Sequence, residues 1–529
     1  MPQTSPVPAS RPRDFSLDTL LRAAATRLAG REASIDGAQR LTYAQLDARV
    51  EALARWLAAK GIAPGDRVAL LLTDGAPFLT VLLACGRIGA IAVLLNWRLA
   101  PPEIAWIAGN AEPAMTFVNP RFAPLLAGAE AGDVIEVDER HDPQGAFEAI
   151  VTGHHDLATW PDLAPDLAPD LAPDLAPDRP LYMMYTSGTT GRPKGCLQAG
   201  SAVAASAMGF CVRRGFTHAE RLLSVNPLFH VVGMQQVAAM LACGGTSVFA
   251  GRDDDSAAIL DLLHREGCTT TSAFPQISFP WAAMEPVRNG VMPLTSYTGG
   301  SGMGRPQMYE FIEKDWDARV VGGYGQTEVC GFATFIDYPD MLEHPRSIGW
   351  PMPHVEMTIL DPDGNRLPPG EEGEICLRGP SVMLGYWRNP EASEAALGHG
   401  WLRTGDLGTM DERGLGYLLG RAKELIKTGG ENVYPAEVDA VFAEMPEVAD
   451  VGCCGVPDRQ WGEAVKAFVV LKPGMELTRE EIARRFRGRI AGYKRPRYVE
   501  FVDRIPRDPL GKLLRRELSA RPVSEDQAA

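Results

Sequence analysis

The chain has 529 residues. At about 150 residues per domain, this length predicts three or four folding units rather than a single small binding module. Hydrophobic residues make up 45% of the chain and aromatic residues 8%, which indicates a large core and excludes wholesale disorder. The formal net charge of -15, from 52 basic and 67 acidic residues, opposes general attraction to nucleic acids or to an anionic membrane surface.

The nine cysteines form no C-x-x-C pair and no cluster with histidines at metal-ligand spacing. This disfavours a zinc site and a disulfide framework. The N-terminus lacks the basic-then-apolar order of a secretory signal, so we expect a cytoplasmic protein. The most apolar stretch, residues 79–95, is interrupted by Arg87 and is shorter than the roughly 20 residues of a membrane span. It predicts a buried helix followed by a buried strand.

Up to about residue 330, periodic helices alternate with short apolar strands. Residues 41–61 predict one such helix, which begins at a capping box of Thr42 and Gln45 and ends at Gly61. Its apolar stripe consists of Leu46, Val50, Leu53 and Leu57. Residues 68–72 follow as a buried strand. The alternation predicts an α/β architecture with largely parallel sheets covered by helices.

The pattern changes after about residue 335. Apolar residues alternate at positions 355, 357 and 359 and again at 375 and 377, and a turn sequence over residues 361–364 separates the two runs. This arrangement is typical of a β-hairpin. We therefore expect a small antiparallel β unit over about residues 335–420.

Two further features divide the chain. Residues 161–176 are four tandem copies of Pro-Asp-Leu-Ala, and because proline removes helix donors we expect residues 161–180 to form a semi-rigid spacer. Residues 421–529 carry 20 basic and 18 acidic residues, a net charge of +2, whereas residues 1–420 carry a net charge of -17. This asymmetry predicts a domain boundary near Gly420.

Residues 186–195, which follow a predicted strand over residues 181–185, suit a polyphosphate. They combine three glycines, four hydroxyl side chains and Lys194. A Walker loop would have Ser or Thr after its lysine, whereas here Gly195 and Cys196 follow. A conventional P-loop ATPase is therefore disfavoured.

Four later segments are ambiguous when taken alone. Residues 323–328 offer a ring that can stack on a base and a carboxylate that can hold Mg2+. Residues 401–408 place Asp406 in a glycine-flanked turn, where it could accept ribose hydroxyls or cap its own turn. Residues 420–435 hold a basic stretch and two glycines. Residues 506–517 place a lysine after a glycine and before a basic helix.

Together, in this order and spacing, the five segments resemble the adenylate-forming superfamily of acyl-CoA synthetases, nonribosomal-peptide adenylation domains and firefly luciferase. The resemblance covers about residues 30–520. It implies a large N-terminal domain over residues 1–420, with two α/β subdomains and a small β-barrel-like subdomain, and a small mobile α+β C-terminal domain over residues 421–529. It also implies an AMP-forming acid-thiol ligase. Such an enzyme converts a carboxylate and ATP to acyl-AMP and pyrophosphate, and CoA then gives acyl-CoA and AMP.

The resemblance further implies roles for individual residues, with Mg2+ as cofactor. The phosphate loop would contain Thr186, Ser187, Gly188, Thr189, Thr190 and Lys194. Adenine would stack on Tyr324 in a pocket lined by Gly300, Ser301 and Gly302. Thr327 would contact the α-phosphate, Glu328 would hold Mg2+, and the ribose would bind Asp406 and Arg421. Lys512 would be the catalytic lysine of adenylation, Lys423 the hinge, and Gly429 with Gly430 the loop beside the CoA channel.

Residues 227–233 resemble the stretch beside the acyl pocket, where His230 would contact or gate the substrate. A purely structural histidine is an equal alternative. The implied pocket walls are small or apolar and offer no Asp to pair a substrate ammonium, which favours a hydrophobic aliphatic, aryl or polycyclic acid over an amino acid. Gly322 replaces a larger polar residue of many relatives and is expected to enlarge the pocket. The expected walls are Ala273, Phe274, Thr298, Gly299, Gly322 and Gly323.

Free CoA is the expected acceptor, because the chain ends at Ala529 without a following carrier-protein segment. Seven basic residues between positions 484 and 497 could attract CoA phosphates, could attract the acidic helix of a carrier, or could form a solvated face. The alternative is an acyl-AMP ligase that passes the acyl group to an acyl carrier protein. A nucleotide-binding regulator without turnover is the remote alternative, and a homodimer stays open.

Overall fold

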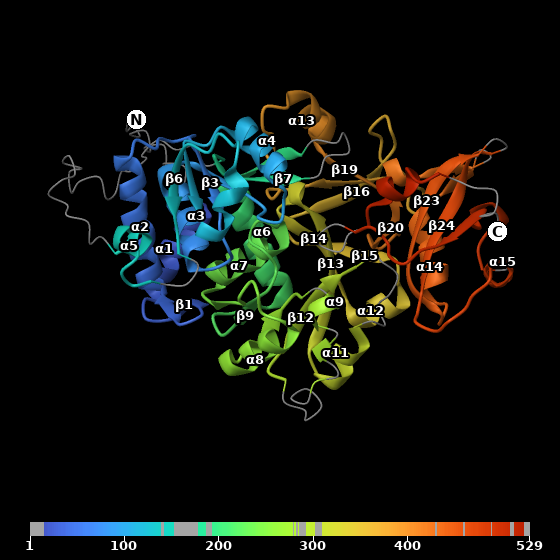
Figure 1. Ribbon diagram of the computed structural model, residues 1–529, viewed down its shortest axis with the longest axis horizontal. Helices are drawn as coiled ribbons and strands as arrows, with labels where there is room; N and C mark the ends of the chain where they lie inside the picture. The colour runs from blue at the N-terminus through green and yellow to red at the C-terminus, as the bar shows by residue number, and fades with distance from the viewer. Residues whose placement is uncertain are drawn as a thin grey trace, which may run out of the picture.

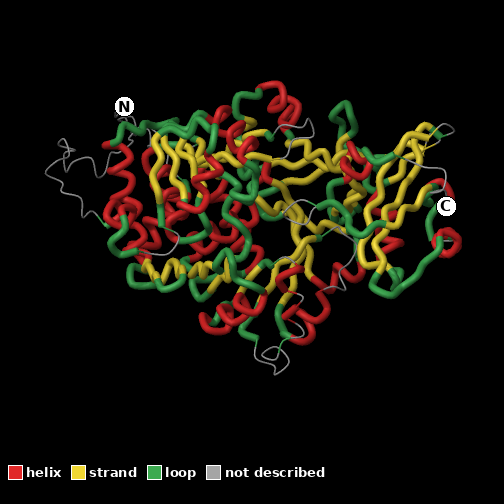
Figure 2. The backbone as a smooth tube through the Cα atoms, viewed as in Figure 1, coloured by secondary structure: helices red, strands yellow, loops and turns green. Residues whose placement is uncertain are grey.

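The computed structural model describes residues 15–138, 142–152, 178–186, 193–273, 275–278, 280–281, 284, 292–301, 309–428, 431–458, 461–487, 489–507 and 513–522. These residues form two large sheets and a smaller third sheet (Figure 1). Helices pack against all three sheets (Figure 2).

The first sheet has seven strands in the order β18-β8-β7-β4-β3-β5-β6 and is parallel from β7 to β6. Its parallel strands are continuous apolar runs because both faces are covered. Leu70 packs into the core on one face, while the next residue, Leu71, packs on the opposite face. The strands are β3 (Arg67–Leu71), β4 (Ile91–Leu94), β5 (Met115–Val118), β6 (Asp133–Glu136), β7 (Pro180–Thr186), β8 (Lys194–Ala199) and β18 (Gly385–Tyr386).

The second sheet has 13 strands in the order β16-β17-β19-β20-β15-β14-β13-β12-β11-β9-β10-β1-β2. It is parallel from β13 to β1 and antiparallel from β13 to β16. The strands of its parallel part and of its β2 edge are β1 (Glu32–Asp36), β2 (Gln39–Thr42), β9 (Arg221–Ser224), β10 (Thr246–Phe249), β11 (Thr270–Thr271), β12 (Ser296–Gly300) and β13 (Arg319–Gln326). The antiparallel strands are β14 (Gly331–Asp337), β15 (Ser347–Pro351), β16 (Glu356–Leu360), β17 (Gly373–Arg378), β19 (Leu402–Met410) and β20 (Gly416–Arg421).

One layer of helices lies between the two large sheets and shares a core with both of them. It contains α1 (Leu17–Arg27), α2 (Tyr43–Ala59), α3 (Ala76–Ile88), α6 (Gly200–Arg214) and α7 (Val231–Cys243), and α5 (Ala146–Val151) packs on α2. The far face of the seven-stranded sheet carries α4 (Pro101–Ala111) and the 3-10 helix η1 (Pro120–Leu126). The far face of the 13-stranded sheet carries α8 (Ser256–Glu266), α9 (Pro275–Ser278), α11 (Glu310–Asp315) and α12 (Tyr338–Glu343).

The third sheet forms the smaller lobe at the C-terminal end of the chain (Figure 1). Its strands are β21 (Ile426–Thr428), β22 (Glu431–Val433), β23 (Val448–Asp458), β24 (Gly462–Leu471) and β25 (Tyr498–Phe501). The helices that follow Gly420 are α14 (Pro435–Ala443), α15 (Arg479–Phe486) and α16 (Arg515–Ser519), while α13 (Pro390–Leu397) packs near β18 and β19. The division of the chain at Gly420 stays a prediction.

Several local predictions are confirmed. Thr42 caps α2 and forms the expected capping box with Gln45. The apolar stretch over residues 79–95 forms most of α3 and then β4. In the expected hairpin, Ile359 pairs with Ile375. The α/β fold class is also confirmed, and none of the described helices is long and apolar enough to cross a membrane.

Two features differ from the simplest expectation. Strands β14 to β20, apart from β18, extend the 13-stranded sheet, and β18 pairs with β8 of the other large sheet. Asp406 lies inside strand β19 and pairs with Arg421 across the sheet, so the prediction of a turn at Asp406 is wrong. Gly405 has a left-handed φ of +73°, but it forms an irregularity within β19: pairing with β17 continues on both sides of it, and Asp406 pairs with β20.

Candidate active site

The carboxyl ends of parallel strands β9, β11, β12 and β13 meet at one edge of the 13-stranded sheet. The register places Thr271 beside Leu223 and Tyr297, and Gly300 beside Gly323. Asn226, just after β9, donates from Nδ2 to the carbonyl oxygen of Ser272 at 2.6 Å. Ligands of open α/β sheets bind outside such carboxyl ends, so the predicted adenine and acyl segments lie where a ligand is expected.

A buried carboxylate connects this edge to the seven-stranded sheet. Asp74 follows β3, and its Oδ1 accepts a hydrogen bond from the backbone N–H of Leu228 at 2.7 Å. Burial raises the pKa of the Asp74 carboxyl to about 7, although the Leu228 hydrogen bond and the nearby Arg98 act in the opposite direction. The bond holds the segment that leads into His230.

The two ends of the predicted phosphate loop lie side by side, because β7 and β8 form a hairpin in which Thr186 pairs with Lys194. The Lys194 ammonium lies 4.9 Å from the centroid of the Tyr386 ring. Within the described part of the chain, Lys194 has no carboxylate partner, so its charge is available to a phosphate. Ser187, Gly188, Thr189 and Thr190 lie outside the described residues.

Tyr324, Asp406 and Arg421 form one hydrogen-bonded group. The phenol of Tyr324 donates to Oδ2 of Asp406 at 2.7 Å, and Nε of Arg421 lies 2.6 Å from Oδ1. Burial, followed by the charge of Asp406, holds the pKa of Tyr324 well above its ordinary value, so the phenol remains a neutral donor. A carboxylate offers about four acceptor positions, so Asp406 can still accept ribose hydroxyls.

Glu328 lies on the 3-10 helix η6 (Thr327–Val329) directly after β13. Its Oε1 accepts a hydrogen bond from the phenol of Tyr386 at 2.8 Å. The carbonyl oxygen of Thr327 accepts from Nε2 of Gln198, which anchors the turn to β8. Mg2+ usually binds one or two carboxylates together with substrate phosphates, and one carboxylate beside the phosphate-loop strand fits that mode. No cluster of three or more metal-ligating side chains occurs among the described residues.

The predicted acyl-pocket glycines are closely packed. A Cβ added at Gly299 would lie 2.5 Å from Cζ of Tyr309, and one at Gly323 would lie 2.4 Å from Cδ1 of Phe332. A Cβ at Gly322 would lie 2.7 Å from Sδ of Met341. Met341 occupies the space that a side chain at Gly322 would take, and the expectation that Gly322 enlarges the pocket stays a prediction. Phe274 and Gly302 lie outside the described residues, whereas Ser301 donates from its backbone N–H to Gly323.

His230 occupies the N-cap position of α7 without a side-chain capping hydrogen bond, and its ring lies 4.8 Å from that of Phe229. Its Nε2 is buried and has no hydrogen-bond partner among the residues that the structure describes. Burial, followed by the charge of Arg98, lowers the pKa of His230 to about 4. The ring is therefore neutral near pH 7, which suits a polar contact more than proton donation.

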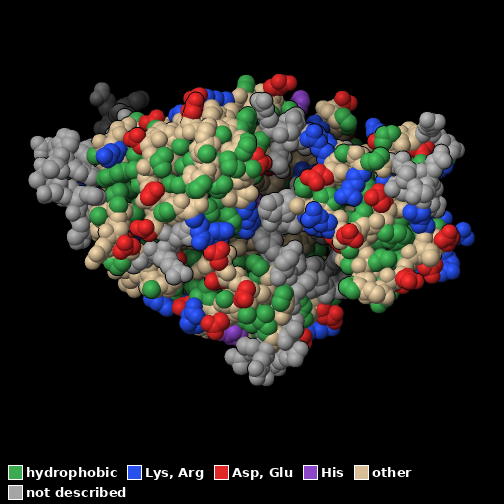
Figure 3. Space-filling view, in the orientation of Figure 1, with side chains coloured by type: hydrophobic (Ala, Val, Ile, Leu, Met, Phe, Trp, Pro, Cys, Tyr) green, Lys and Arg blue, Asp and Glu red, His purple; other side chains and the backbone are tan. Residues whose placement is uncertain are grey.

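The predicted hinge residue Lys423 is exposed and lies on the 3-10 helix η8 (Ala422–Glu424), between the second and third sheets. Lys and Arg side chains lie on both sides of the hollow where the two lobes meet (Figure 3). Gly429, Gly430 and Lys512 lie outside the described residues.

Comparison with known families agrees with this arrangement. The profile of the AMP-binding enzyme family matches residues 21–387, and that of the AMP-binding enzyme C-terminal domain matches residues 437–512. The chain belongs to the AMP-binding enzyme family. It is an AMP-forming acyl-CoA synthetase.

Several characterised members of the AMP-binding enzyme family are similar along most of their length. Indoleacetate–CoA ligase of Aromatoleum aromaticum is 36% identical over 92% of this chain and 95% of its own. Feruloyl-CoA synthase of an Amycolatopsis species is 34% identical over 92% and 94%. Fatty acid–[acyl-carrier-protein] ligase ScoC of Streptomyces coeruleorubidus is 33% identical over 91% of each chain.

Solved structures of AMP-binding enzymes share the fold. The o-succinylbenzoate CoA synthetase of Bacillus subtilis in complex with its acyl-adenylate intermediate has a TM-score of 0.81 at 29% identity, covering 96% of this chain and 99% of that one. The same enzyme in complex with ATP and magnesium ion has a TM-score of 0.80 at 28% identity, covering 94% and 98%.

Sequence reasoning missed two residues at the site of this AMP-binding enzyme. Tyr386 reaches Glu328 from a strand 58 positions further along the chain, and Asp74 reaches Leu228 across 154 positions. An acidic residue just after a predicted strand was a signal for Asp74. The sequence held no comparable signal for Tyr386, because its partner Glu328 lies 58 positions away along the chain.

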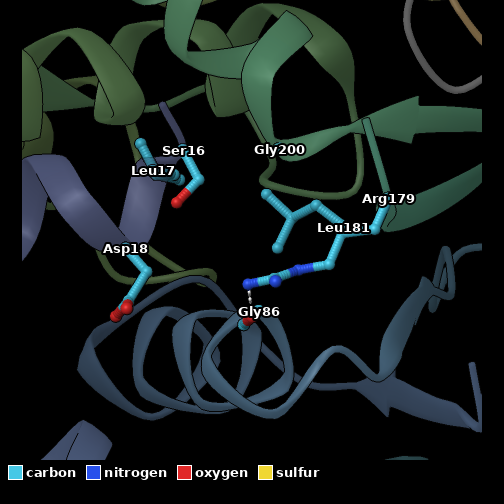
Figure 4. A pocket seen from close by; sticks show the side chains of 7 residues that line it. All are labelled: Ser16, Leu17, Asp18, Gly86, Arg179, Leu181 and Gly200. Carbon is cyan, nitrogen blue, oxygen red and sulfur yellow. Dashed lines mark hydrogen bonds between the residues drawn. The ribbon is translucent and has the colours of Figure 1, made fainter. Parts of the chain in front are cut away.

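One small cavity of this AMP-binding enzyme lies away from the candidate active site. It is lined by Ser16, Leu17, Asp18, Gly86, Arg179, Leu181 and Gly200 (Figure 4). Arg179, near the end of the expected spacer, donates across the cavity to the carbonyl oxygen of Gly86 at 2.8 Å. The lining includes none of the predicted site residues.

Gly325→Ala is expected to reduce activity by about 100-fold, the order associated with misplacing a catalytic group by about 1 Å. A Cβ at Gly325 would lie 1.8 Å from the carbonyl oxygen of Gly331, so β13 and β14 must separate just before Glu328. Acid-dependent pyrophosphate release measures the effect. Gly109→Ala is the control, because its Cβ would meet open space on α4. Wild-type activity in Gly325→Ala would contradict the close approach of the two strands.

Asp74→Asn is expected to raise the free energy of unfolding relative to that of the wild type, and this difference should grow as pH rises. The native pKa of Asp74 is about 7 and the ordinary value is 3.8, so the native state binds more protons between these values and the wild type loses stability as pH increases. Asn keeps an oxygen acceptor for the N–H of Leu228 and cannot ionise. Unfolding at about pH 5 and about pH 8 should show the advantage of the variant growing by about 2 kcal/mol. An advantage that does not change with pH would argue against a protonated Asp74.

Proposed function

We propose that this AMP-forming acyl-CoA synthetase activates a hydrophobic carboxylic acid, aliphatic, aryl or polycyclic, with Mg2+-bound ATP and free CoA. The grouping of Tyr324 with Asp406 and Arg421, next to Glu328, supports the nucleotide part of this proposal. These side chains offer a ring for adenine, acceptors for the ribose and a carboxylate for a hard cation.

In the first step, a carboxylate oxygen of the acid attacks the α-phosphorus of ATP. A new oxygen–phosphorus bond forms, and the bond to pyrophosphate breaks. Two unit charges 4 Å apart repel by about 1 kcal/mol in water and by about 4 kcal/mol at an effective dielectric near 20, so cations must be placed in advance. Lys194 and Lys512 would supply positive charge from the protein. Bound Mg2+, held by Glu328 and the phosphates, would supply the rest.

In the second step, the sulfur of CoA attacks the carbonyl carbon of acyl-AMP and AMP leaves. The two steps need different partners at one carbonyl. We propose that the segment after Gly420 turns about Lys423, first to present Lys512 and then to present Gly429 and Gly430 beside the CoA channel. The position of Lys423 between the second and third sheets supports such a hinge.

The neighbourhood of His230 supports a hydrophobic acid. The ring of His230 lies beside the apolar ring of Phe229, and His230 is neutral near pH 7. The names of similar enzymes, an indoleacetate ligase and a feruloyl-CoA synthase, make aryl acids the first to test. A second candidate is transfer to an acyl carrier protein, which the similarity to a fatty acid–carrier ligase favours.

A panel of aliphatic, aryl and polycyclic acids, each incubated with ATP, Mg2+ and either CoA or a carrier protein, tests this proposal. We expect pyrophosphate and AMP to be released with a hydrophobic acid, and acyl-CoA to be detected by mass. Removing Mg2+ with a chelator should abolish pyrophosphate release. Transfer only to the carrier would favour the second candidate. Release of ADP in place of AMP would contradict the reaction.

Lys512→Ala is expected to suppress formation of acyl-AMP by about 100-fold or more, because a preorganised positive charge is lost from the transition state. Conversion of supplied acyl-AMP and CoA to acyl-CoA should be largely spared. Pyrophosphate release and acyl-CoA mass measure the two steps separately, and Lys472→Ala is a control for loss of a lysine on the same side of Gly420. Equal loss of both steps would contradict the role of Lys512.

A further inference from the structure

Residues 383–387, here called the connecting segment, run between the element that carries Glu328, the proposed Mg2+ ligand, and the strand that carries Lys194 of the proposed phosphate loop. The backbone N–H of Met383 donates to the carbonyl oxygen of Glu328 at 2.8 Å. At its other end, the N–H of Trp387 donates to the carbonyl oxygen of Gly195 at 2.7 Å. The connecting segment is therefore fastened both to η6 and to β8.

One side chain of this segment contacts both predicted groups. The phenol of Tyr386 donates to Oε1 of Glu328 at 2.8 Å, and Nζ of Lys194 lies over the Tyr386 ring, 4.9 Å from its centroid. Tyr386, Glu328 and Lys194 are each only partly exposed. The phenol thus bonds the carboxylate while the face of the same ring contacts the ammonium.

We infer that Tyr386 is a positioning residue that sets Glu328 for the Mg2+ of ATP and keeps Lys194 at the end of the phosphate loop. This inference rests on the proposed roles of Glu328 and Lys194. Tyr386 itself need not touch the nucleotide.

The chemistry of the two contacts supports such a role. A phenol donor occupies one side of Oε1, and Oε2 of Glu328 has no hydrogen-bond partner in the described part of the chain. A glutamate that is free to change rotamer loses conformational entropy when it binds a cation, and a side chain that is already oriented loses less. The negative face of an aromatic ring attracts an ammonium, so Lys194 is held without a carboxylate that would compete with phosphate for its charge.

Backbone hydrogen bonds hold the connecting segment in place without the hydroxyl of Tyr386. Oγ of Ser393 accepts a hydrogen bond from the backbone N–H of Tyr386 at 2.8 Å, and the N–H of Leu384 donates to the carbonyl oxygen of Leu197 at 2.9 Å. These bonds do not involve the Tyr386 side chain. Tyr386→Phe should therefore keep the connecting segment and the ring in place while it removes the bond to Glu328.

The test measures nucleotide binding rather than turnover. The full-length chain is titrated by calorimetry with α,β-methylene ATP, which cannot be cleaved at the α-phosphorus, first with a chelator and then over a series of Mg2+ concentrations. For Tyr386→Phe we expect the affinity for the nucleotide analogue to be unchanged with the chelator. The Mg2+ concentration that gives half of the Mg2+-dependent rise in affinity should increase about five- to tenfold. Tyr386→Leu, which also removes the ring from Lys194, should in addition weaken binding about threefold with the chelator.

Two further variants separate the possible failures. Tyr498→Phe is the matched control, because its phenol donates to Oδ2 of Asp458 at 2.9 Å in the third sheet. It should follow the wild-type Mg2+ curve, and a shift equal to that of Tyr386→Phe would overturn the inference. If Glu328→Gln shifts the Mg2+ curve and Tyr386→Phe does not, the role of Tyr386 is wrong and that of Glu328 stands. If neither variant shifts it, the proposed site of Mg2+ is wrong as well.

Discussion

The buried carboxylate of Asp406 is the constraint on which the proposed nucleotide site depends. Its residue is 3% exposed, and a buried charge is costly unless it is paired. Tyr324 and Arg421 supply that pairing from β13 and β20. The strands between them in the sheet, β14 and β15, must therefore keep their register, because a one-residue slip would turn these side chains to the opposite face.

This pairing also connects the nucleotide site to the C-terminal part of the chain. Arg421 ends β20, and the next residues form η8, from which the chain enters the third sheet. The group that would hold the ribose is thus adjacent to the segment about which the smaller lobe would turn. A nucleotide bound to Asp406 and Arg421 would stiffen the starting point of that motion.

The charged side chains near the phosphate loop act differently from the net charge of the whole chain. The net charge of -15 excludes general binding of polyanions, and ATP is itself a polyanion. Lys194 resolves this conflict near the phosphate loop, since it contacts an aromatic ring rather than a carboxylate. Glu328 is the complementary case, a carboxylate whose place beside the loop strand suits a cation shared with the phosphates. The placement of a few charged side chains can therefore matter more for ATP binding than the net charge of the chain does.

The sequence by itself determined features whose cause is local. Thr42 and Gln45 begin a helix because a capping box needs only four consecutive residues, and the strand before the phosphate loop and the order of the five motifs are also local features of the chain. Tertiary structure alone decided the features that depend on contacts between distant residues. The extended conformation of Asp406 comes from pairing with β17 and β20, the close packing at Gly322 comes from Met341, and the contact of Tyr386 with Glu328 comes from β18 pairing with β8. Such contacts depend on sheet order and register, which residue spacing does not encode locally.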